Sequence, residues 1–517
     1  MTEPTTPVAA LGPAPPPEAT SLVRRTGVGM LWAQAAKMVE VGLTFAIAVL
    51  AIRALQPVRF GEYSVITNLA GVGSILLPIA TTEAMGALLP RFRRRGERVF
   101  LLLAVLLGRG GLIVIGMAAL VLCWPSVHGL FGLAGVGAGV AVIGGTYWLA
   151  LDALNTVAGW FVAEIAVRTA AVARVVGQLV TLVALAFVVG TGAASVGRVV
   201  ACAAGGYAVA AVSLIAGIRW RPVRPQAQQL RSVVTFSRNV WLAGVLTLVL
   251  ATQADVLLIG ALTKQPRQVA YYAAAVGVVT RIQLVLLAGW TSLVIPALGH
   301  ARVNGGEAAF LRGWRLFAKL SLLTTLPVNV LLIVLARPLT TVVAGASYQP
   351  AAGLLRWVAA FNIAAALVGG TLGVSALWVV DRTGAVVRVR IATALVNLAL
   401  AIVLILHWHA LGAAVATGIA AVLTSGSELL LARRYARVNF PARFAVDVCV
   451  ACAAAAAPAL FLRPAGAGGM AVAAALGVTL FAAVLSVIRP FEQGDVEFLA
   501  EVSERLAASP LARLARP

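Results

Sequence analysis

Fourteen apolar stretches of about 20 residues run through this 517-residue sequence. A helix needs about 20 mainly apolar residues to cross a bilayer, so each stretch predicts a membrane-spanning helix. The chain is 61% hydrophobic and 11% charged, whereas globular domains carry about 25% charged residues. We therefore expect an all-α integral membrane protein with 14 transmembrane helices. The stretches are 27–53, 60–89, 99–123, 134–160, 165–190, 194–218, 233–262, 268–298, 314–336, 350–378, 385–406, 410–432, 443–462 and 467–488.

Basic residues are distributed unequally between the two sides of this predicted bundle. Fourteen crossings place both termini on one side, and that side holds 29 of the 40 basic residues. Cytoplasmic loops of membrane proteins carry an excess of Lys and Arg. Both termini are therefore predicted to lie in the cytoplasm, with the chain in the cytoplasmic (inner) membrane. The opposite side holds six basic residues, Arg53, Arg59, Lys264, Arg267, Arg337 and Arg463.

The stretch 32–98 is repeated about 207 residues later. Each copy contains a long apolar helix, a short polar hairpin that ends in tyrosine, a second apolar helix and a basic loop. The landmarks that match are Trp32 with Trp241, Ile52 with Ile259, Tyr63 with Tyr271, and Pro90 with Pro296. Chance similarity between Ala/Val/Leu-rich spans is the alternative. A true repeat of this size is typical of a transporter made of two related lobes, parallel because each copy has an even number of spans.

The repeat and the loop charges together predict six segments. They are a disordered cytoplasmic tail (1–23), an N-lobe of helices 1–6 (24–218), a basic cytoplasmic linker (219–238), a C-lobe of helices 7–12 (239–438), two further helices (439–488), and a cytoplasmic amphipathic tail (489–517).

Charged residues inside the predicted spans are the strongest indicators of function. A charge in the hydrocarbon costs about 3 kcal/mol on insertion scales and usually faces the bundle interior. Lys37 and Glu40 lie three residues apart on one helix face and can pair. For these residues a structural ion pair remains the alternative to a role in transport. The other deeply placed charges are Glu83, Arg109, Asp152, Asp255, Arg281 and Arg356, and the polar residues that accompany them are Gln34, Asn68, Gln253, Gln283, Asn329 and Asn362.

Patterns that would indicate an enzyme or a cofactor are weak in this sequence. The four histidines are scattered, and Cys449-x-x-Cys452 lies in an apolar span, where small packing residues are expected. The sequence has no Walker lysine motif, so ATP hydrolysis is not expected. We therefore predict a protein that is not an enzyme, with no cofactor and no metal, driven by an ion gradient, the membrane potential or the substrate gradient.

Several motifs resemble one known family in their order and spacing. "AIRALQPVRFGEYSV" resembles the end of helix 1 in the Wzx polysaccharide flippases, which belong to the multidrug/oligosaccharidyl-lipid/polysaccharide exporter superfamily. "QADVLLIGALTKQPRQVAYYAAA" is similar to that family's helix 7–8 hairpin, and "IPALGHARVNG" and "GASYQPAAGLLRWVAAFN" resemble later landmarks. The resemblance covers residues 24–490. One departure is that "GASYQPA" lacks the usual Phe-Gly before Tyr348.

The resemblance implies two lobes around a cavity and a polyprenyl-pyrophosphate-linked oligosaccharide moved from the inner to the outer leaflet. The expected partners are this substrate, membrane lipid and possible polymerases or glycosyltransferases, but no nucleic acid. Alternatives are a multidrug or small-solute antiporter of the same superfamily, a lipid-linked peptidoglycan precursor flippase, and a polymerase or glycosyltransferase. The substrate-binding residues expected are Arg53, Arg281, Arg356, Lys37, Gln34 and Gln283, and those expected in coupling or ion pairs are Glu40, Glu83, Asp152 and Asp255. Asp255 is expected to hold Arg281 while the cavity is empty.

Overall fold

The chain is helical and contains no β-strand in the residues that the structure describes. The computed structural model describes residues 17–76, 89, 92, 94–133, 135–164, 166–227, 230, 233–234, 237, 241, 252–287, 291–370, 372–492 and 495. Eleven helices within these ranges are long and apolar enough to cross a membrane. The predicted all-α membrane class is therefore confirmed, whereas the count of fourteen spans stays a prediction.

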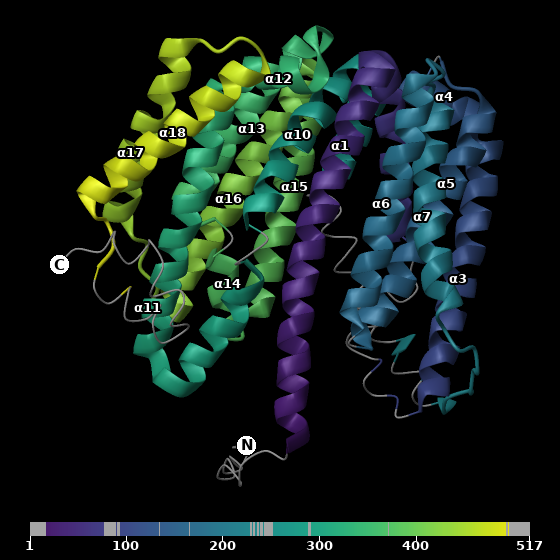
Figure 1. The fold of residues 1–517 in the computed structure, drawn as a ribbon, viewed down its shortest axis with the longest axis horizontal. Coiled ribbons are helices and arrows are strands. Elements are labelled where there is room, and N and C mark those ends of the chain that lie inside the picture. Colours follow the sequence, from purple (N-terminus) through teal and green to yellow (C-terminus); the bar gives the residue numbers. More distant parts are fainter. Residues whose placement is uncertain are drawn as a thin grey trace.

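The helices form two groups on either side of a long first helix (Figure 1). Element α1 (Pro17–Leu76) consists of two helices that meet at a kink at Gln56, and it packs against both α6 and α10. On one side of it lie α3 (Arg95–Leu122), α4 (Trp124–Phe131), α5 (Ala138–Ala163), α6 (Val167–Gly190) and α7 (Val196–Ala216). The second half of the chain contains α9 (Thr252–Thr263), α10 (Pro266–Leu287), α11 (Thr291–Val334), α12 (Ala336–Ala344), η2 (Ala346–Tyr348), α13 (Gln349–Leu367), α14 (Leu372–Val379), α15 (Thr383–Trp408), α16 (Ala410–Ala436), α17 (Ala442–Leu462) and α18 (Gly466–Ile488).

Some helices begin and end at places that the apolar pattern does not show. The predicted span 350–378 is divided into α13 and α14, because Gly369 and Gly370 between them adopt φ values of 116° and 52°. In α11 the chain turns at Gly306 (φ 68°), so α11 consists of two helices that meet at this glycine. Glycine adopts positive φ without a Cβ clash, which explains why these breaks fall at glycines.

The two hairpins of the sequence repeat have matching turns. Gln56 in α1 has φ 57° and ψ 176°, and Lys264, which precedes α10, has φ 53°. These positions are 208 residues apart, close to the repeat spacing, and neither residue is a glycine. A non-glycine residue with positive φ is uncommon, so the positive φ at both positions supports the repeat. The superposition of the two predicted lobes stays a prediction.

The C-terminal segment is attached to the second helix group by a buried ion pair. Lys319 in α11 is 1% exposed, and its Nζ lies 2.6 Å from Asp495 Oδ2. Phe491 is 1% exposed and packs edge-on against Phe444 of α17, at 5.2 Å between ring centroids. The described start of the tail therefore packs against the helix bundle, as predicted. The rest of 489–517 lies outside the described residues.

Candidate functional site

A central cavity of about 480 Å³ lies between the two helix groups. Both halves of α1 form one side of it, together with residues from α5, α6 and α7. The opposite wall comes from α9 and α10, with Val343 at the end of α12. The cavity therefore contacts both copies of the sequence repeat, as the polar residues of those copies predicted.

The described lining of the central cavity is polar but contains a single charged side chain, Arg281 of α10. Its Nη1 donates a hydrogen bond to the carbonyl oxygen of Gly277 at 3.0 Å. A guanidinium has five N–H donors, so most of its capacity is available to a ligand. The remaining polar lining consists of three tyrosines, three amides and five hydroxyl residues, namely Tyr63, Tyr147, Tyr207, Asn68, Gln178, Gln253, Thr44, Ser64, Thr67, Thr181 and Thr280.

The two other predicted phosphate ligands contact helix ends instead of lining this cavity. Arg53 donates to the carbonyl oxygens of Val342 and Val343, in the last turn of α12. Arg356 Nε donates to the carbonyl oxygen of Ile333, near the end of α11, at 3.3 Å. The last carbonyls of a helix lack partners and carry partial negative charge, so an arginine is favourable there. The structure therefore does not gather the predicted trio of arginines at one site.

The other predicted substrate ligands lie in separate places. Gln283 Nε2 donates to Asn329 Oδ1 at 3.2 Å, joining α10 to α11 outside the central cavity lining. Lys37 is half exposed and pairs with Glu40 at 3.2 Å, as predicted. The side chain of Gln34 and the whole of Glu83 lie outside the described residues.

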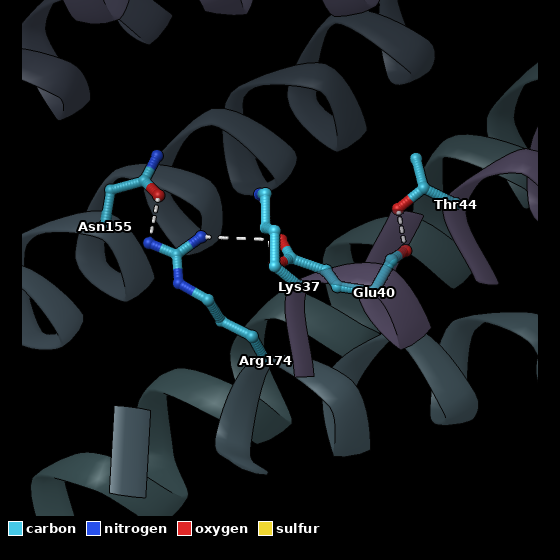
Figure 2. A network of polar contacts seen from close by, with 5 residues as sticks. All are labelled: Lys37, Glu40, Thr44, Asn155 and Arg174. Carbon is cyan, nitrogen blue, oxygen red and sulfur yellow. Dashed lines mark hydrogen bonds and ion pairs between the residues drawn. The ribbon is translucent and has the colours of Figure 1, made fainter. Parts of the chain in front are cut away.

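Glu40 belongs to a polar network that joins α1, α5 and α6 (Figure 2). Arg174 of α6 lies 3.9 Å from Glu40 and donates to Asn155 Oδ1 of α5 at 3.0 Å. Thr44, one turn from Glu40, donates to the Glu40 carbonyl oxygen and also lines the central cavity. The network therefore lies next to the cavity, on the side predicted to face the cytoplasm. The sequence alone did not reveal this network, because Arg174 is one of the 29 basic residues of the predicted cytoplasmic side and is not distinguished from them.

Asp255 is buried within the second helix group and does not pair with Arg281. Its Oδ2 accepts hydrogen bonds from the Tyr272 hydroxyl at 2.5 Å and from Thr417 Oγ1 at 2.8 Å. Tyr272 and Arg281 are nine residues apart on α10, which is two and a half turns, so they face opposite sides of that helix. The expected Asp255–Arg281 pair is therefore wrong in this structure. Asp255 instead joins α9, α10 and α16.

Asp152 forms a buried ion pair with Arg109. The Arg109 Nε and Nη2 atoms lie 2.8 and 2.5 Å from the two carboxylate oxygens, and Nη2 also donates to the Ser74 carbonyl oxygen. Both side chains are almost fully buried. This arrangement joins α1, α3 and α5, and it places Asp152 in an ion pair.

Removal of Arg109 should therefore destabilise the protein strongly. Arg109→Ala leaves the Asp152 carboxylate buried without its guanidinium, which typically costs about 3–5 kcal/mol. Denaturant unfolding of the purified protein in detergent measures the change in free energy of unfolding. The paired replacement Arg109→Met with Asp152→Leu leaves no charge behind and should recover most of the loss. Equal stability of Arg109→Ala and the wild-type protein would contradict this interpretation.

On the predicted outer side, the two hairpins of the repeat pack directly against each other. A Cβ atom added at Gly61 would overlap with the Pro266 carbonyl group. Tyr348 is fully buried and lies edge-on to Phe60 and Tyr271, with ring centroids 6.3 and 6.1 Å away, respectively. We call this contact between residues 56–63 and 264–272, together with Tyr348, the outer seam. Two of its residues, Phe60 and Tyr63, also line the central cavity.

Comparisons with known proteins agree with this architecture. Residues 49–353 match the family described as polysaccharide biosynthesis protein. A solved structure titled "Lipid II flippase MurJ, inward closed conformation" has a TM-score of 0.69 at 13% identity, covering 90% of this chain and 98% of that chain. An inward-facing multidrug resistance MATE family transporter of the MOP superfamily has a TM-score of 0.55 at 14% identity, covering 80% and 98%. No curated protein sequence matches the chain. The predicted superfamily is thus confirmed at the level of its fold.

Proposed function

The chain belongs to the polysaccharide biosynthesis protein family, and from this premise we propose that it is a lipid-linked oligosaccharide flippase. It moves a polyprenyl-pyrophosphate-linked oligosaccharide from the inner to the outer leaflet by alternating access, for cell-surface polysaccharide synthesis. The observation that carries this proposal is the central cavity, whose described lining has Arg281 as its one charge among tyrosines, amides and hydroxyls.

The cavity chemistry suits each polar part of such a substrate. A guanidinium donates parallel hydrogen bonds to two oxygens of a phosphate group, so Arg281 suits the pyrophosphate. Amide and hydroxyl side chains pair with sugar hydroxyl groups, and aromatic rings bury the apolar faces of the sugar. The polyprenyl tail remains in the bilayer between the helix groups. Arg53 and Arg356 then serve as helix-end anchors and not as phosphate ligands.

The membrane potential favours the proposed direction. A negative charge gains about 2.3 kcal/mol per 100 mV when it moves outward across an inside-negative membrane. A doubly charged headgroup therefore gains about 4–5 kcal/mol at that voltage. The return of the empty cavity, which carries Arg281, is favoured inward by the same field.

One observation favours a peptidoglycan precursor as the substrate, and another argues against a cationic drug. The likeness to a lipid II flippase supports a lipid-linked peptidoglycan precursor, which shares the same pyrophosphate chemistry. A multidrug antiporter for cations would need acidic groups at its substrate site, and the described residues that line the central cavity include none. The test therefore compares both pyrophosphate-linked lipids with a cationic dye.

The experiment uses the purified full-length chain in liposomes. Fluorescent lipid-linked oligosaccharide is placed in both leaflets, and an impermeant hydrolase outside releases label from molecules that reach the outer leaflet. We expect complete release with protein and release of only the outer half in protein-free liposomes. Faster release of the peptidoglycan precursor would assign that substrate instead, and transport of the dye alone would refute the proposal.

The orientation predicted from loop charge is part of the same proposal, with both termini in the cytoplasm and the two lobes rocking around the central cavity. In a variant whose four native cysteines are replaced by serine, Gln265→Cys on the second hairpin should react with an impermeant maleimide added to intact cells. Arg95→Cys in the basic 91–98 loop should react only after the cells are permeabilised. Labelling of Arg95→Cys in intact cells would overturn this topology.

A further inference from the structure

A second cavity of about 650 Å³ lies at the outer seam, whose residues form most of its lining. Residues 54–59 of the first hairpin line one side, and Arg267 and Tyr271 of the second hairpin line the other, with Ser347 from η2. We propose that this outer pocket is a second anion site, in which Arg59 and Arg267 bind the phosphate group of a lipid. The inference rests on the proposed function in that the lipid-linked substrate is one source of this phosphate.

Two arginines that are far apart in the sequence line the same pocket. Arg59 and Arg267 are 208 residues apart, and each follows the turn of its own hairpin. Both side chains are exposed, and neither makes a hydrogen bond or ion pair of normal length with another described residue. Glu62 of the first hairpin accepts a hydrogen bond from the Gly135 backbone at 3.0 Å, and its carboxylate also interacts electrostatically with Arg59 without a hydrogen bond between them. The guanidinium donors in the pocket are therefore available to an anion.

The location of these charges is unusual for a membrane protein. Basic residues collect on the cytoplasmic side and are rare outside, and only six of 40 fall on the predicted outer side of this chain. Four of the six, Arg53, Arg59, Lys264 and Arg267, belong to the two hairpins or adjoin them. Arg53 is occupied by the carbonyls of α12. Three of the five other outer charges, Arg59, Lys264 and Arg267, thus lie at the two hairpins, and two of these line one pocket. Phosphate is the anion that membrane lipids supply there.

The pocket is placed to receive a phosphate group that leaves the central cavity. Tyr271 lines the outer pocket, while Ala273 and Ala274, on the next half-turn of α10, line the central cavity. Residues of the outer seam line both cavities, Phe60 and Tyr63 the central cavity and Tyr271 the outer pocket. When the hairpins separate, one path connects Arg281 with Arg59 and Arg267. The outer arginines then hold the phosphate while the hairpins close again behind it.

Binding of geranyl pyrophosphate to the full-length protein in phosphatidylcholine nanodiscs tests this inference. Wild-type protein should bind at two sites. The double variant Arg59→Gln/Arg267→Gln should lose one site, with affinity reduced about tenfold or more, because each charged hydrogen-bonded contact is removed. Arg281→Gln should lose the other. The control Arg337→Gln/Arg463→Gln removes the same charge from the predicted outer side away from the pocket, and it should bind as the wild type does.

The two possible sources of phosphate give different results in a second arm. If phosphatidylglycerol in the nanodisc competes for the Arg59/Arg267 site, the pocket holds phospholipid headgroups; if it does not, the site is selective for the pyrophosphate of the substrate. The single variants Arg59→Gln and Arg267→Gln, each expected to weaken the site about tenfold, carry the test if the double variant does not fold. Two unchanged sites in the double variant, or equal weakening in the control, would overturn the proposal. Failure of the liposome transport assay with this site intact would reject only the proposed function.

Discussion

Replacing Arg281 by alanine should lower export of the lipid-linked oligosaccharide by about ten- to a hundredfold. A hydrogen bond to a charged group contributes about 1.5–3 kcal/mol, and 1.4 kcal/mol corresponds to a factor of ten. Arg281 is the only charged residue in the described cavity lining, so no neighbour there can replace it. Release of fluorescent label from liposomes, or complementation of cells that lack the flippase, measures the loss.

The Arg281→Ala protein should still fold and insert. The one described hydrogen bond of Arg281 goes to the carbonyl oxygen of Gly277 in its own helix, and no described acid depends on it. Arg109 differs, because its removal leaves the buried Asp152 carboxylate without its ion-pair partner. Unchanged unfolding of Arg281→Ala combined with lost transport would therefore separate substrate binding from structure.

Arg281→Lys should restore only part of the transport. The ammonium keeps the positive charge but cannot donate two parallel hydrogen bonds to one phosphate group. Arg356→Ala is the matched control, because that guanidinium contacts the carbonyl oxygen of Ile333 and lies outside the described cavity lining. It should affect stability more than transport. Normal transport by Arg281→Ala would remove the phosphate-binding role from this residue.

The membrane fold was predictable because bilayer physics acts on short sequence windows. Apolar length and loop charge identify spans without any knowledge of tertiary contacts. The outer hairpins were also visible, since Gln56-Pro57 and Gln265-Pro266 interrupt apolar runs at the repeat spacing. A cavity between the repeat copies follows from the cost of placing their polar residues in lipid.

The roles of individual charges were not predictable, because they depend on partners far away in the sequence. Arg109 and Arg281 give the same signal, one arginine in an apolar helix. The first meets Asp152, 43 residues away, whereas the second faces an open cavity. Asp255 likewise takes its partner Thr417 from α16, 162 residues away. The cavity tyrosines Tyr147 and Tyr207 gave no signal, since a tyrosine in an apolar span looks like any packing residue.

The outer seam provides the second large expected effect, through Gly61. Closure brings the Pro266 carbonyl group to the place where any other residue at this position would have its Cβ. Gly61→Leu should therefore disfavour the closed seam by about 1–3 kcal/mol, the usual cost of overpacking. Such a cost shifts the balance between closed and open seams by about five- to 150-fold towards open. Alternating access requires each side to close in turn, so transport should fall along with closure.

Accessibility of the central cavity measures that shift. Thr280 is exposed within the cavity, so Thr280→Cys in the cysteine-free background should react slowly with impermeant maleimide from outside while the seam is closed. Adding Gly61→Leu should raise this labelling rate several-fold. Gly42→Leu is the control, since it lies in the same helix α1 and a Cβ there meets no atom within 4 Å. Equal labelling rates in the two leucine variants would show that the Gly61–Pro266 contact does not close the outer side, because its disruption would then leave the barrier in place.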